Sequence, residues 1–561
     1  MSKIAVHPAI KRHLAEHGLC GEEDIENYLF PKLKDLPSPF LLKSIDTAVD
    51  LISSAIQNKD DILIWGDYDV DGITGTSLLH TFFREIGVTT ICHIPNRLTD
   101  GYGLNDKVLR DYATTLRPNK LLITVDCGIS NSEELILAKK YGFKTIVTDH
   151  HQVPDTTLYA DATINPKQQD CGFPFSELAG VGVAFYLAAA VRFKISNNDE
   201  YKEICVPNMK SFLDYVAIGT IADIMPLKGV NRILVKGGFE SISVTRQRGV
   251  KNLLSTLDIN IDSLTSDAVS FKVAPAINAA GRLGEPDKPL NLFLADSDAS
   301  AKEYASQLIQ LNNKRKQITE HNFESALNIA HKELILCSNC LVILGEFHEG
   351  VLGIVASRLV EKFRVPALVC CYHPADRSVV KGSGRAPEGH DLYRLIAGAE
   401  RYLQNFGGHA LAAGFSLPVA NFIQFKEKLY TLMSLHDENN THISSSLERK
   451  FIELDVSESL DRTLLDNLMQ LEPTGEANPK PIFLDRHVRF VSFSAFGKNK
   501  AHLKGVIRGK YKNVPVIGFN LGDRISKTNL NEPCSLLYTH SFESYNGRSS
   551  WRLHIKDIIS H

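Results

Sequence analysis

The chain has 561 residues, of which 43% are apolar and 23% are charged, and its formal net charge is −3. A chain of this length is too long for a single hydrophobic core, so we expect about three or four domains. The composition is that of an ordinary soluble globular protein, and the longest uncharged apolar stretch, residues 178–191, is too short to span a membrane.

The first 44 residues mix a short helix with Pro31, Pro37 and Pro39, and we expect them to form an N-terminal adaptor. The opening residues lack the apolar core of a signal peptide, which predicts a cytoplasmic protein. The ten cysteines form no disulfide or zinc framework, and this pattern fits a reducing compartment.

Apolar runs alternate with amphipathic stretches from residue 45 to about 165. We predict strands at 61–66, 90–94, 120–126 and 143–148, and helices at 74–87 and 131–141. Such alternation predicts an α/β fold with a parallel, doubly wound sheet. In these sheets, ligands bind outside the carboxyl ends of the strands. We assign residues 45–290 to this first α/β domain, with residues 175–280 mostly helical.

Acidic and imidazole side chains gather at those carboxyl ends. The string DYDVDG follows the first strand directly, and we expect it to stay extended, so that its alternate aspartates point the same way. Other members end the later strands, and one lies near the end of a helix just before Pro226. The residues are Asp67, Asp69, Asp71, Asp126, Asp149, His150, His151 and Asp223.

Crowded carboxylates repel one another unless cations or hydrogen-bond donors neutralise them. Aspartate oxygens and imidazoles suit divalent ions such as Mn²⁺ or Mg²⁺. Four carboxylates with a neutral imidazole balance two divalent cations, which together can activate a water and clamp a phosphoryl group. A neighbouring imidazole can stabilise developing charge or protonate the leaving oxygen. The alternative is a set of unrelated solvated or capping aspartates, which their joint placement disfavours. We therefore interpret the chain as a metal-dependent phosphoesterase.

The second half of the chain predicts three further parts. Residues 297–333 lack Gly and Pro after the capping candidates Asp296 and Ser297, and we expect one long connecting helix. A second α/β unit follows at 338–436, with strands near 341–345, 366–372 and 379–385. After a polar linker at 436–446, short β-rich runs over 450–561 predict a small barrel.

The C-terminal segment has its own charge balance. From Asp485 to His561 there are 13 Lys or Arg and 5 Asp or Glu, a local charge of +8, so the rest of the chain carries −11. Aromatic residues are interleaved with these cations. Short strands, cations and rings are what an OB-type barrel uses to bind single-stranded nucleic acid, although most of the rings should be core. We therefore expect a polyanion-binding module beside the metal-binding one.

The order of the motifs resembles that of the DHH phosphoesterase superfamily, in particular its RecJ branch of single-stranded-DNA-specific exonucleases. The matching segments cover nearly the whole chain and are GDYDVDGITGT, IPNRLTDGYGLN, TVDCGIS, TDHH, LAGVGVAFYL, AIGTIADIMPL, INAAGRLGEPDKP, EGVLGIVASRLVEKF, KGSGRA, FGGHALAAGF and ANPKPIF. The resemblance implies a DHH catalytic domain, a DHHA1 domain at 338–436 and an OB-fold domain at 450–561.

The resemblance also implies roles for individual residues. It implies that Asp69, Asp71, Asp126, His150 and Asp223 are metal ligands, His151 the catalytic imidazole and Asp149 its support. It implies that Arg97, Arg282, Ser383, Arg385 and His409 contact DNA phosphates. In small-substrate relatives a histidine precedes the motif-I aspartates by four residues, where this chain has Trp65. Asp67 either supplies the missing ligand or only supports the site.

The function that follows from the resemblance is 5′→3′ degradation of single-stranded DNA to mononucleotides with two Mn²⁺ or Mg²⁺ ions. It implies work in recombination and repair, with single-strand-binding protein and a DNA helicase as partners, by a protein that we expect to be a monomer. One alternative is a small-substrate enzyme of the superfamily, an oligoribonuclease or a pyrophosphatase. Another is a catalytically inactive replication scaffold on the same fold.

Overall fold

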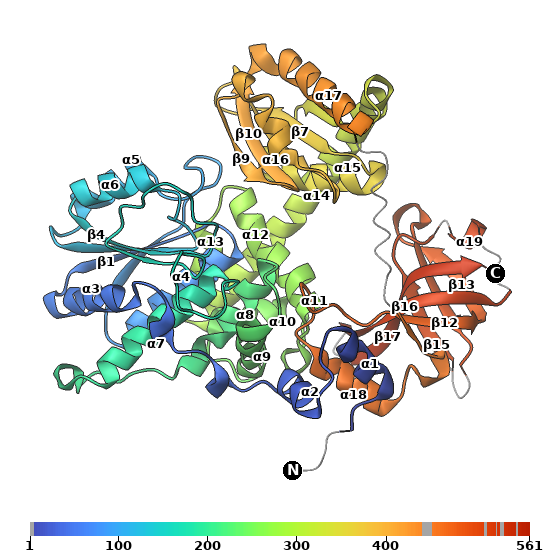
Figure 1. The fold of residues 1–561 in the computed structure, drawn as a ribbon, viewed down its shortest axis with the longest axis horizontal. Helices are drawn as coiled ribbons and strands as arrows, with labels where there is room; N and C mark the ends of the chain where they lie inside the picture. Colours follow the sequence, from blue (N-terminus) through green and yellow to red (C-terminus); the bar gives the residue numbers. More distant parts are fainter. Residues whose placement is uncertain are drawn as a thin grey trace.

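The computed structural model describes residues 5–439, 451–509, 513–522, 524–527, 532–545 and 548–560. Its strands form three sheets, with the orders β2-β1-β3-β4-β5, β6-β7-β8-β10-β9 and β11-β12-β16-β17-β15-β14-β13. Figure 1 shows the first sheet on the left, the second at the top and the third on the right. The predicted α/β class, with two α/β domains, a long joining helix and a C-terminal β domain, is confirmed.

The first sheet is entirely parallel. Its strands are β1 (Asp61–Gly66), β2 (Thr90–His93), β3 (Lys120–Val125), β4 (Phe143–Thr148) and β5 (Ala162–Ile164). Because side chains alternate along a strand, Ile62 and Ile64 face one hydrophobic core while Leu63 and Trp65 face another. Helices cover both faces, so the sheet is doubly wound as predicted.

The helices divide between these two cores. The first core takes α3 (Ile45–Asn58), α4 (Val70–Glu85) and α7 (Gly180–Ser196), and the second takes α5 (Asp106–Thr115) and α6 (Ser132–Lys140). A helical region then packs beside α4. Its elements are α8 (Leu213–Ala222), α9 (Gly229–Ile242), α10 (Arg248–Thr256), α11 (Ser266–Ala268), a π-helical turn (Val269–Val273), α12 (Ala274–Arg282) and α13 (Asp287–Phe293).

One helix, α14 (Asp298–Leu336), joins the two α/β domains, close to the predicted 297–333. The side chain of Ser297 caps it by accepting a hydrogen bond from the Ser300 amide. Ala301 and Leu308 belong to the core of the first domain, whereas Ala326 and Ala330 belong to that of the second. The helix is therefore built into both domains.

The second sheet is mixed. It contains β6 (Leu341–Gly345), β7 (Ala367–Tyr372), β8 (Val379–Arg385), β9 (Asn405–His409) and β10 (Ala412–Pro418), with helices α15 (Leu352–Phe363), α16 (Leu392–Ala397) and α17 (Phe422–Asn439). Strands β8, β10 and β9 are antiparallel neighbours, and β9 lies at the edge. The predicted linker at 436–446 begins inside α17, and its residues 440–446 lie outside the described residues.

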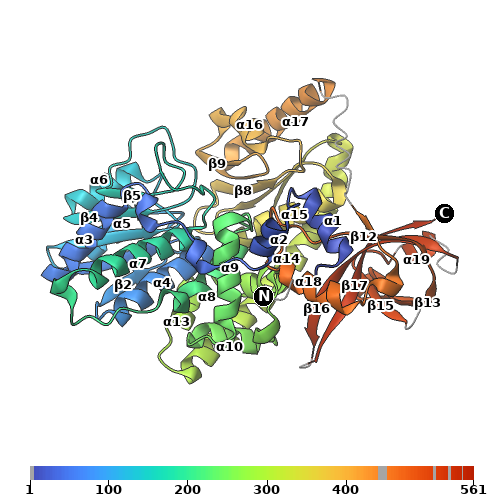
Figure 2. The same cartoon turned by 60° about the horizontal axis from the view of Figure 1, so that its bottom comes forward.

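The C-terminal domain carries the third sheet. Its strands are β11 (Ile452–Glu453), β12 (Phe483–Val488), β13 (Phe490–Phe496), β14 (His502–Ile507), β15 (Val514–Gly518), β16 (Cys534–Tyr545) and β17 (Arg548–Ser560), with helices α18 (Arg462–Leu471) and α19 (Arg524–Lys527). The N-terminal helices α1 (Pro8–Glu16) and α2 (Glu22–Leu29) share its core through Ile10, Leu14 and Leu29. Figures 1 and 2 both place α1 beside α18. In the described part of the chain, no helix is long and apolar enough to span a membrane.

Candidate metal centre

Three carboxylates form a row along the carboxyl edge of the first sheet. Asp67, Asp126 and Asp149 are each the first residue after a strand, and each amide continues the pairing to the neighbouring strand. The hydrogen bonds run from Asp67 N to Val125 O (3.1 Å), from Asp126 N to Thr148 O (3.0 Å) and from Asp149 N to Ile164 O (3.1 Å). The parallel register therefore brings these side chains to one level, as expected for this sheet type.

The DYDVDG string is not extended, and that prediction is wrong. Strand β1 ends at Gly66, and α4 begins at Val70 because the Asp69 side chain accepts hydrogen bonds from the Asp71 and Gly72 amides (2.9 and 3.2 Å). A side chain at Gly72 would begin 2.5 Å from the Asp67 backbone nitrogen, so the tight turn requires glycine there. The turn therefore places the Asp69 carboxylate near Asp67 and Asp126, and the Asp71 carboxylate near His150 and Asp223.

The predicted ligands meet in overlapping groups, whose donor atoms lie within 4.8 Å of one another. One group is Asp67, Asp69 and Asp126, a second is Asp71, His150 and Asp223, and a third joins Asp126 to His150 and His151. His150 Nε2 lies 3.1 Å from Asp126 Oδ1, 3.5 Å from Asp223 Oδ2 and 3.7 Å from Asp71 Oδ2. Asp126 therefore lies where two adjacent cation sites would share a ligand.

The electrostatics of this cluster favour bound cations. Burial and the nearby Asp69 raise the pKa of Asp71 to about 7, and burial with Asp71 and Asp69 raises that of Asp223 to about 9. Burial also raises the pKa of Asp67 and of Asp126 well above the usual value. The cluster holds more carboxylates than can ionise together without positive charge.

The donor atoms also fit a divalent ion. Among the described residues, Asp67 Oδ1, Asp126 Oδ1 and both ring nitrogens of His150 are buried without a hydrogen-bond partner. Burial and the adjacent His151 lower the pKa of His150 to about 3, so its ring is neutral and able to coordinate. Buried polar atoms of this kind require a partner, and oxygen with imidazole nitrogen suits Mn²⁺ or Mg²⁺.

His151 has a different environment from His150. Its Nδ1 lies 2.8 Å from Asp149 Oδ1, and Asp149 also accepts hydrogen bonds from the amides of His150, His151 and Ile129. Burial acts to lower the pKa of His151, but the hydrogen bond to Asp149 outweighs it and raises the pKa to about 9. Burial acts to raise the pKa of Asp149, but the His151 contact lowers it. His151 is therefore an oriented, protonated imidazole.

Two aromatic side chains beside the cluster were missed by sequence reasoning. The Tyr102 hydroxyl lies 3.3 Å from His151 Nδ1 and from the Asp126 carbonyl oxygen. The Tyr68 ring packs edge-on to Tyr102 and lies under the Arg97 guanidinium, 5.2 Å from its centroid. Both tyrosines lie inside the matched motif segments, and that position was the available signal.

The predicted arginines gather near the same edge. Burial and repulsion from Arg97, Arg315 and Arg385 lower the pKa of Arg282 to about 10, which places four guanidinium groups in one neighbourhood. Within the described residues, none of the four forms an ion pair with a carboxylate. Arg315 was not predicted, because α14 brings it there from outside the matched motifs.

The second domain contributes one sheet face. Arg385, Ala412 and His409 are cross-strand neighbours, and so are Ser383, Gly414 and Gly407. The three predicted residues, Ser383, Arg385 and His409, therefore lie on the same face of the sheet. Side chains at Gly407 or Gly414 would meet nothing within 4 Å, which leaves a flat open surface beside them.

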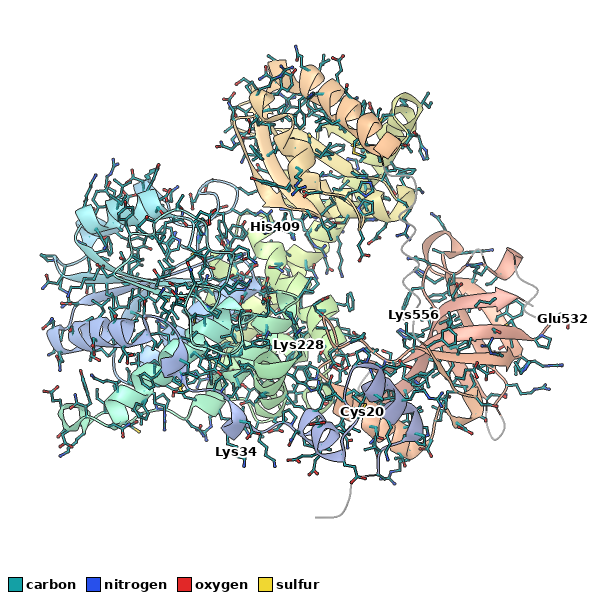
Figure 3. All side chains as sticks on the ribbon, in the orientation of Figure 1. Cys20, Lys34, Lys228, His409, Glu532 and Lys556 are labelled. Atoms are coloured by element: carbon teal, nitrogen blue, oxygen red, sulfur yellow. The ribbon has the colours of Figure 1, made fainter. Side chains whose placement is uncertain are left out.

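This face is turned toward the first domain. Arg282 Nη1, at the end of α12, donates to the Gly350 carbonyl (3.2 Å), so the two domains touch there. Figure 3 shows His409 on the side of the second domain that is nearer α12. Phosphate-binding candidates from both domains therefore converge near the carboxylate cluster.

Trp65 occupies the position at which small-substrate relatives have a histidine. Its side chain is fully buried, its Nε1 donates to the Gly103 carbonyl (3.2 Å), and its ring stacks on His93. No imidazole can therefore reach the cluster from this position.

A row of rings crosses one face of the C-terminal sheet. The centroid distances are 5.3 Å for Phe496 and His502, 5.4 Å for His502 and Phe519, and 5.6 Å for Phe519 and His554. Beside this row lies a groove lined in part by Phe496, Lys504 and Arg552. A row of exposed and partly buried rings with cations beside it matches what single-stranded nucleic acid requires.

Comparison with known families matches three segments of the chain. The model for the DHH family N-terminal domain matches residues 61–220, that for the DHHA1 domain matches 338–435, and that for the RecJ OB domain matches 452–557. The segments correspond to the sheets described above.

Several relatives match nearly the whole chain. The single-stranded-DNA-specific exonuclease RecJ of Escherichia coli is 33% identical over 568 residues, which cover 98% of this chain and 96% of that protein. RecJ of Bacillus subtilis is 30% identical, with coverage of 99% and 68%. Among solved structures, Thermus thermophilus RecJ in complex with Mn²⁺ matches with a TM-score of 0.80 and 28% identity, covering 100% of this chain and 77% of that one. The Mg²⁺ complex from the same organism matches with a TM-score of 0.73 at 27% identity, covering 100% and 76%.

Proposed function

This chain belongs to the family of RecJ single-stranded-DNA-specific exonucleases, and from that premise we propose that it degrades single-stranded DNA from the 5′ end to mononucleotides. The observation that carries the proposal is the buried carboxylate–imidazole cluster, several of whose ligand atoms have no hydrogen-bond partner among the described residues. Beside it lies a group of arginines that form no ion pair within the same part of the chain. An arrangement of this kind suits metal-dependent phosphodiester hydrolysis.

The proposed ligands of two divalent cations are Asp69, Asp71, Asp126, His150 and Asp223. Asp67 is the sixth proposed ligand. Its buried Oδ1 has no hydrogen-bond partner among the described residues. This chain also has the buried Trp65 at the position where small-substrate relatives have a histidine, so a carboxylate would replace that imidazole. Mn²⁺ or Mg²⁺ bound there would supply an activated water and a clamp on the scissile phosphate. Asp126 belongs to two of the three groups, so its carboxylate would contribute to both cation sites.

His151 donates the proton that the leaving oxygen needs. Asp149 fixes the ring through Nδ1, so Nε2 is the nitrogen that gives up the proton. With a pKa of about 9, the ring is protonated at neutral pH and ready to act as a general acid. In this proposal Asp149 acts through His151 and touches no substrate.

Five side chains hold the phosphates of the DNA strand: Arg97, Arg282, Ser383, Arg385 and His409. A guanidinium donates two parallel hydrogen bonds to phosphate, and the open glycine surface lets the sugar–phosphate chain lie close to the second sheet. Arg315 adds charge from α14. Phosphates held from both domains would keep the terminal nucleotide over the metal cluster.

The C-terminal domain binds the strand further along, where Phe496, His502 and Phe519 stack on bases. Family membership supports work in recombination and repair in the cytoplasm. It also supports a monomer that acts with single-strand-binding protein and a helicase. Two alternatives fit less well. An enzyme for small substrates would not need a basic, ring-lined C-terminal domain. A catalytically inactive scaffold would not be expected to retain all the proposed metal ligands.

A digestion assay tests the proposal. Oligonucleotides labelled at the 5′ or the 3′ end are incubated with the protein, with and without Mn²⁺, beside duplex DNA and dinucleotides. With metal, we expect immediate release of label as mononucleotide from the 5′-labelled single strand, none from the 3′-labelled strand or the duplex, and slower hydrolysis of the dinucleotides. Without metal, we expect no release. Asp126→Ala should abolish release, whereas Asp111→Ala, on the exposed face of α5, should not. Release from the 3′ end first, or equal activity of Asp126→Ala, would contradict the proposal.

A further inference from the structure

The loop that follows Asp223 is fastened to a distant part of the chain. Asp223 caps the end of α8, and the next residue, Ile224, has a φ of 58° although its side chain is 71% exposed. A left-handed conformation is costly for a β-branched residue, and packing of an exposed side chain does not offset that cost. The helix C-cap holds Ile224 in this conformation, with hydrogen bonds from Ile224 N to Ile221 O and from Met225 N to Thr220 O (both 3.2 Å). Distant contacts then hold the residues that follow.

Two of these contacts come from residues 470–478, which we call the junction and which lie between the end of α18 and β12 in the C-terminal domain. The Leu227 amide donates to the Glu476 carbonyl (2.8 Å). A side chain at Gly475 would begin 3.0 Å from Leu227 Cδ1, so the junction backbone lies against the Leu227 side chain. About 250 residues separate these partners in the sequence, yet the proposed metal ligand is only four residues from the contact.

The junction is in turn anchored on α9, the helix that follows the loop. Arg232 is buried and donates to the carbonyl oxygens of Leu471 (3.0 Å) and Pro473 (3.2 Å). Lys236 Nζ donates to those of Gln470 (2.6 Å) and Glu472 (3.1 Å). A buried cation without a partner is costly, so these backbone contacts hold the junction firmly.

Two further groups close the network. Glu472 is buried and accepts hydrogen bonds from the Ser266 amide and hydroxyl (3.2 and 2.9 Å), at the start of α11. Asn478 donates to the Leu471 carbonyl (3.2 Å) and accepts from the Tyr28 hydroxyl, and the Tyr28 ring packs on the Arg232 guanidinium. The junction therefore joins the first domain, the N-terminal helices and the C-terminal domain at one point.

We propose that the junction is a positioning element for Asp223, and that through it the placement of the DNA-binding C-terminal domain sets the geometry of the metal centre. The inference rests on the proposed function of Asp223 as a metal ligand. If the junction shifts, Leu227 moves with it, and Asp223 leaves the distance from His150 Nε2 at which both can hold one ion. Groups that orient ligands in this way typically change metal affinity by roughly 10- to 100-fold.

The test uses Gly475→Ala in the full chain without DNA, with Mn²⁺ affinity measured by titration of free Mn²⁺ in electron paramagnetic resonance. The added methyl presses on Leu227, so we expect Mn²⁺ binding to weaken by roughly tenfold or more. The control is Gly18→Ala. Both glycines have a φ that side chains rarely adopt (+157° at Gly475 and +84° at Gly18), but an added methyl at Gly18 would meet nothing within 4 Å. The control variant should bind Mn²⁺ as the parent does.

Activity gives the second measurement. Hydrolysis of a dinucleotide, too short to reach the C-terminal domain, should fall with Gly475→Ala at limiting Mn²⁺ and recover at high Mn²⁺. Unchanged Mn²⁺ affinity, with a loss confined to long strands, would mean that the junction only holds the C-terminal domain in place, and would overturn the inference. A parent that binds no Mn²⁺ would instead contradict the proposed function.

A milder variant covers the case in which Gly475→Ala does not fold. Glu472→Gln keeps the shape of the side chain but removes the negative charge, which accepts hydrogen bonds from the Ser266 amide and hydroxyl and lies near Arg232 and Lys236. Its thermal unfolding should remain cooperative and its Mn²⁺ affinity should fall by a smaller factor. A cooperatively folded Glu472→Gln with parental affinity would overturn the inference.

Discussion

The contact between Asp149 and His151 makes a specific prediction at the scale of single residues. Asp149→Asn removes the negative charge that outweighs burial, so the pKa of His151 should fall from about 9 toward the ordinary value of about 6.5. Because the protonated ring is the active form, the alkaline limb of the kcat profile should move to lower pH. At about pH 8 we expect a loss of roughly 10- to 100-fold. An alkaline limb that stays near pH 9 would contradict the assignment of His151 as the acid.

The buried aspartates predict how stability depends on pH in the absence of metal. Burial and neighbouring carboxylates raise the pKa of Asp71 to about 7 and that of Asp223 to about 9. Because the folded state then binds more protons than the unfolded chain, stability falls as pH rises from about 4 through this range. Bound cations remove the repulsion, so the gain in Tm on adding Mn²⁺ in place of EDTA should be larger at about pH 8 than at about pH 6. Equal gains at both pH values would contradict this account.

Sequence reasoning selected the residues of the cluster but not their local geometry. The predicted ligands meet because the ends of parallel strands lie at one level. The conformation of DYDVDG was predicted wrongly, because the Asp69 side chain accepts capping hydrogen bonds from the Asp71 and Gly72 amides and the strand ends there. The directions of the Trp65 and Asp67 side chains could not be predicted either. Whether a carboxylate replaces a missing imidazole depends on which side chain faces the cluster, and a sequence does not contain that information.

The open face of strands β8, β10 and β9 is the surface on which we expect the DNA backbone to lie. Gly414→Val places a side chain on the open face between Ser383 and Gly407, where nothing lies within 4 Å, and valine suits a strand. Stability should change by about 0.5 kcal/mol or less, while kcat/KM on single-stranded DNA should fall by roughly 100-fold, because the displaced strand no longer meets the cluster. Thermal unfolding and Mn²⁺ binding serve as controls. Full activity would show that DNA does not use this face.

Element boundaries followed from the sequence where periodicity was strong, and contacts between distant elements did not. Strands β1 to β4 of the first sheet and the long helix α14 lie close to their predicted ranges, whereas the short strand β5 was not predicted. The N-terminal segment was expected to be an adaptor, yet Ile10 and Leu29 pack in the core of the C-terminal domain. No local pattern reveals such a partner. Arg315 was missed for the same reason, since only the path of α14 brings it to Arg282.

The ring row of the C-terminal domain should matter for long DNA strands but not for substrates too short to reach it. Phe519 is 53% exposed in the row of rings, and Phe519→Ala should weaken binding of long single strands by about 1–3 kcal/mol while leaving dinucleotide hydrolysis unchanged. The matched control is Val491→Ala on β13, which is similarly exposed but outside the ring row. Binding is measured by fluorescence anisotropy with a metal-free protein. Equal affinity of parent and Phe519→Ala would show that the strand follows another face.

Anomalous X-ray diffraction from manganese-soaked crystals would locate the proposed cations. We expect two manganese peaks, roughly 3.5–4 Å apart, with Asp126 between them, Asp67 and Asp69 around one, and His150 and Asp223 around the other. Diffraction that shows no manganese among these side chains, in crystals soaked well above any physiological concentration, would contradict the proposed metal centre.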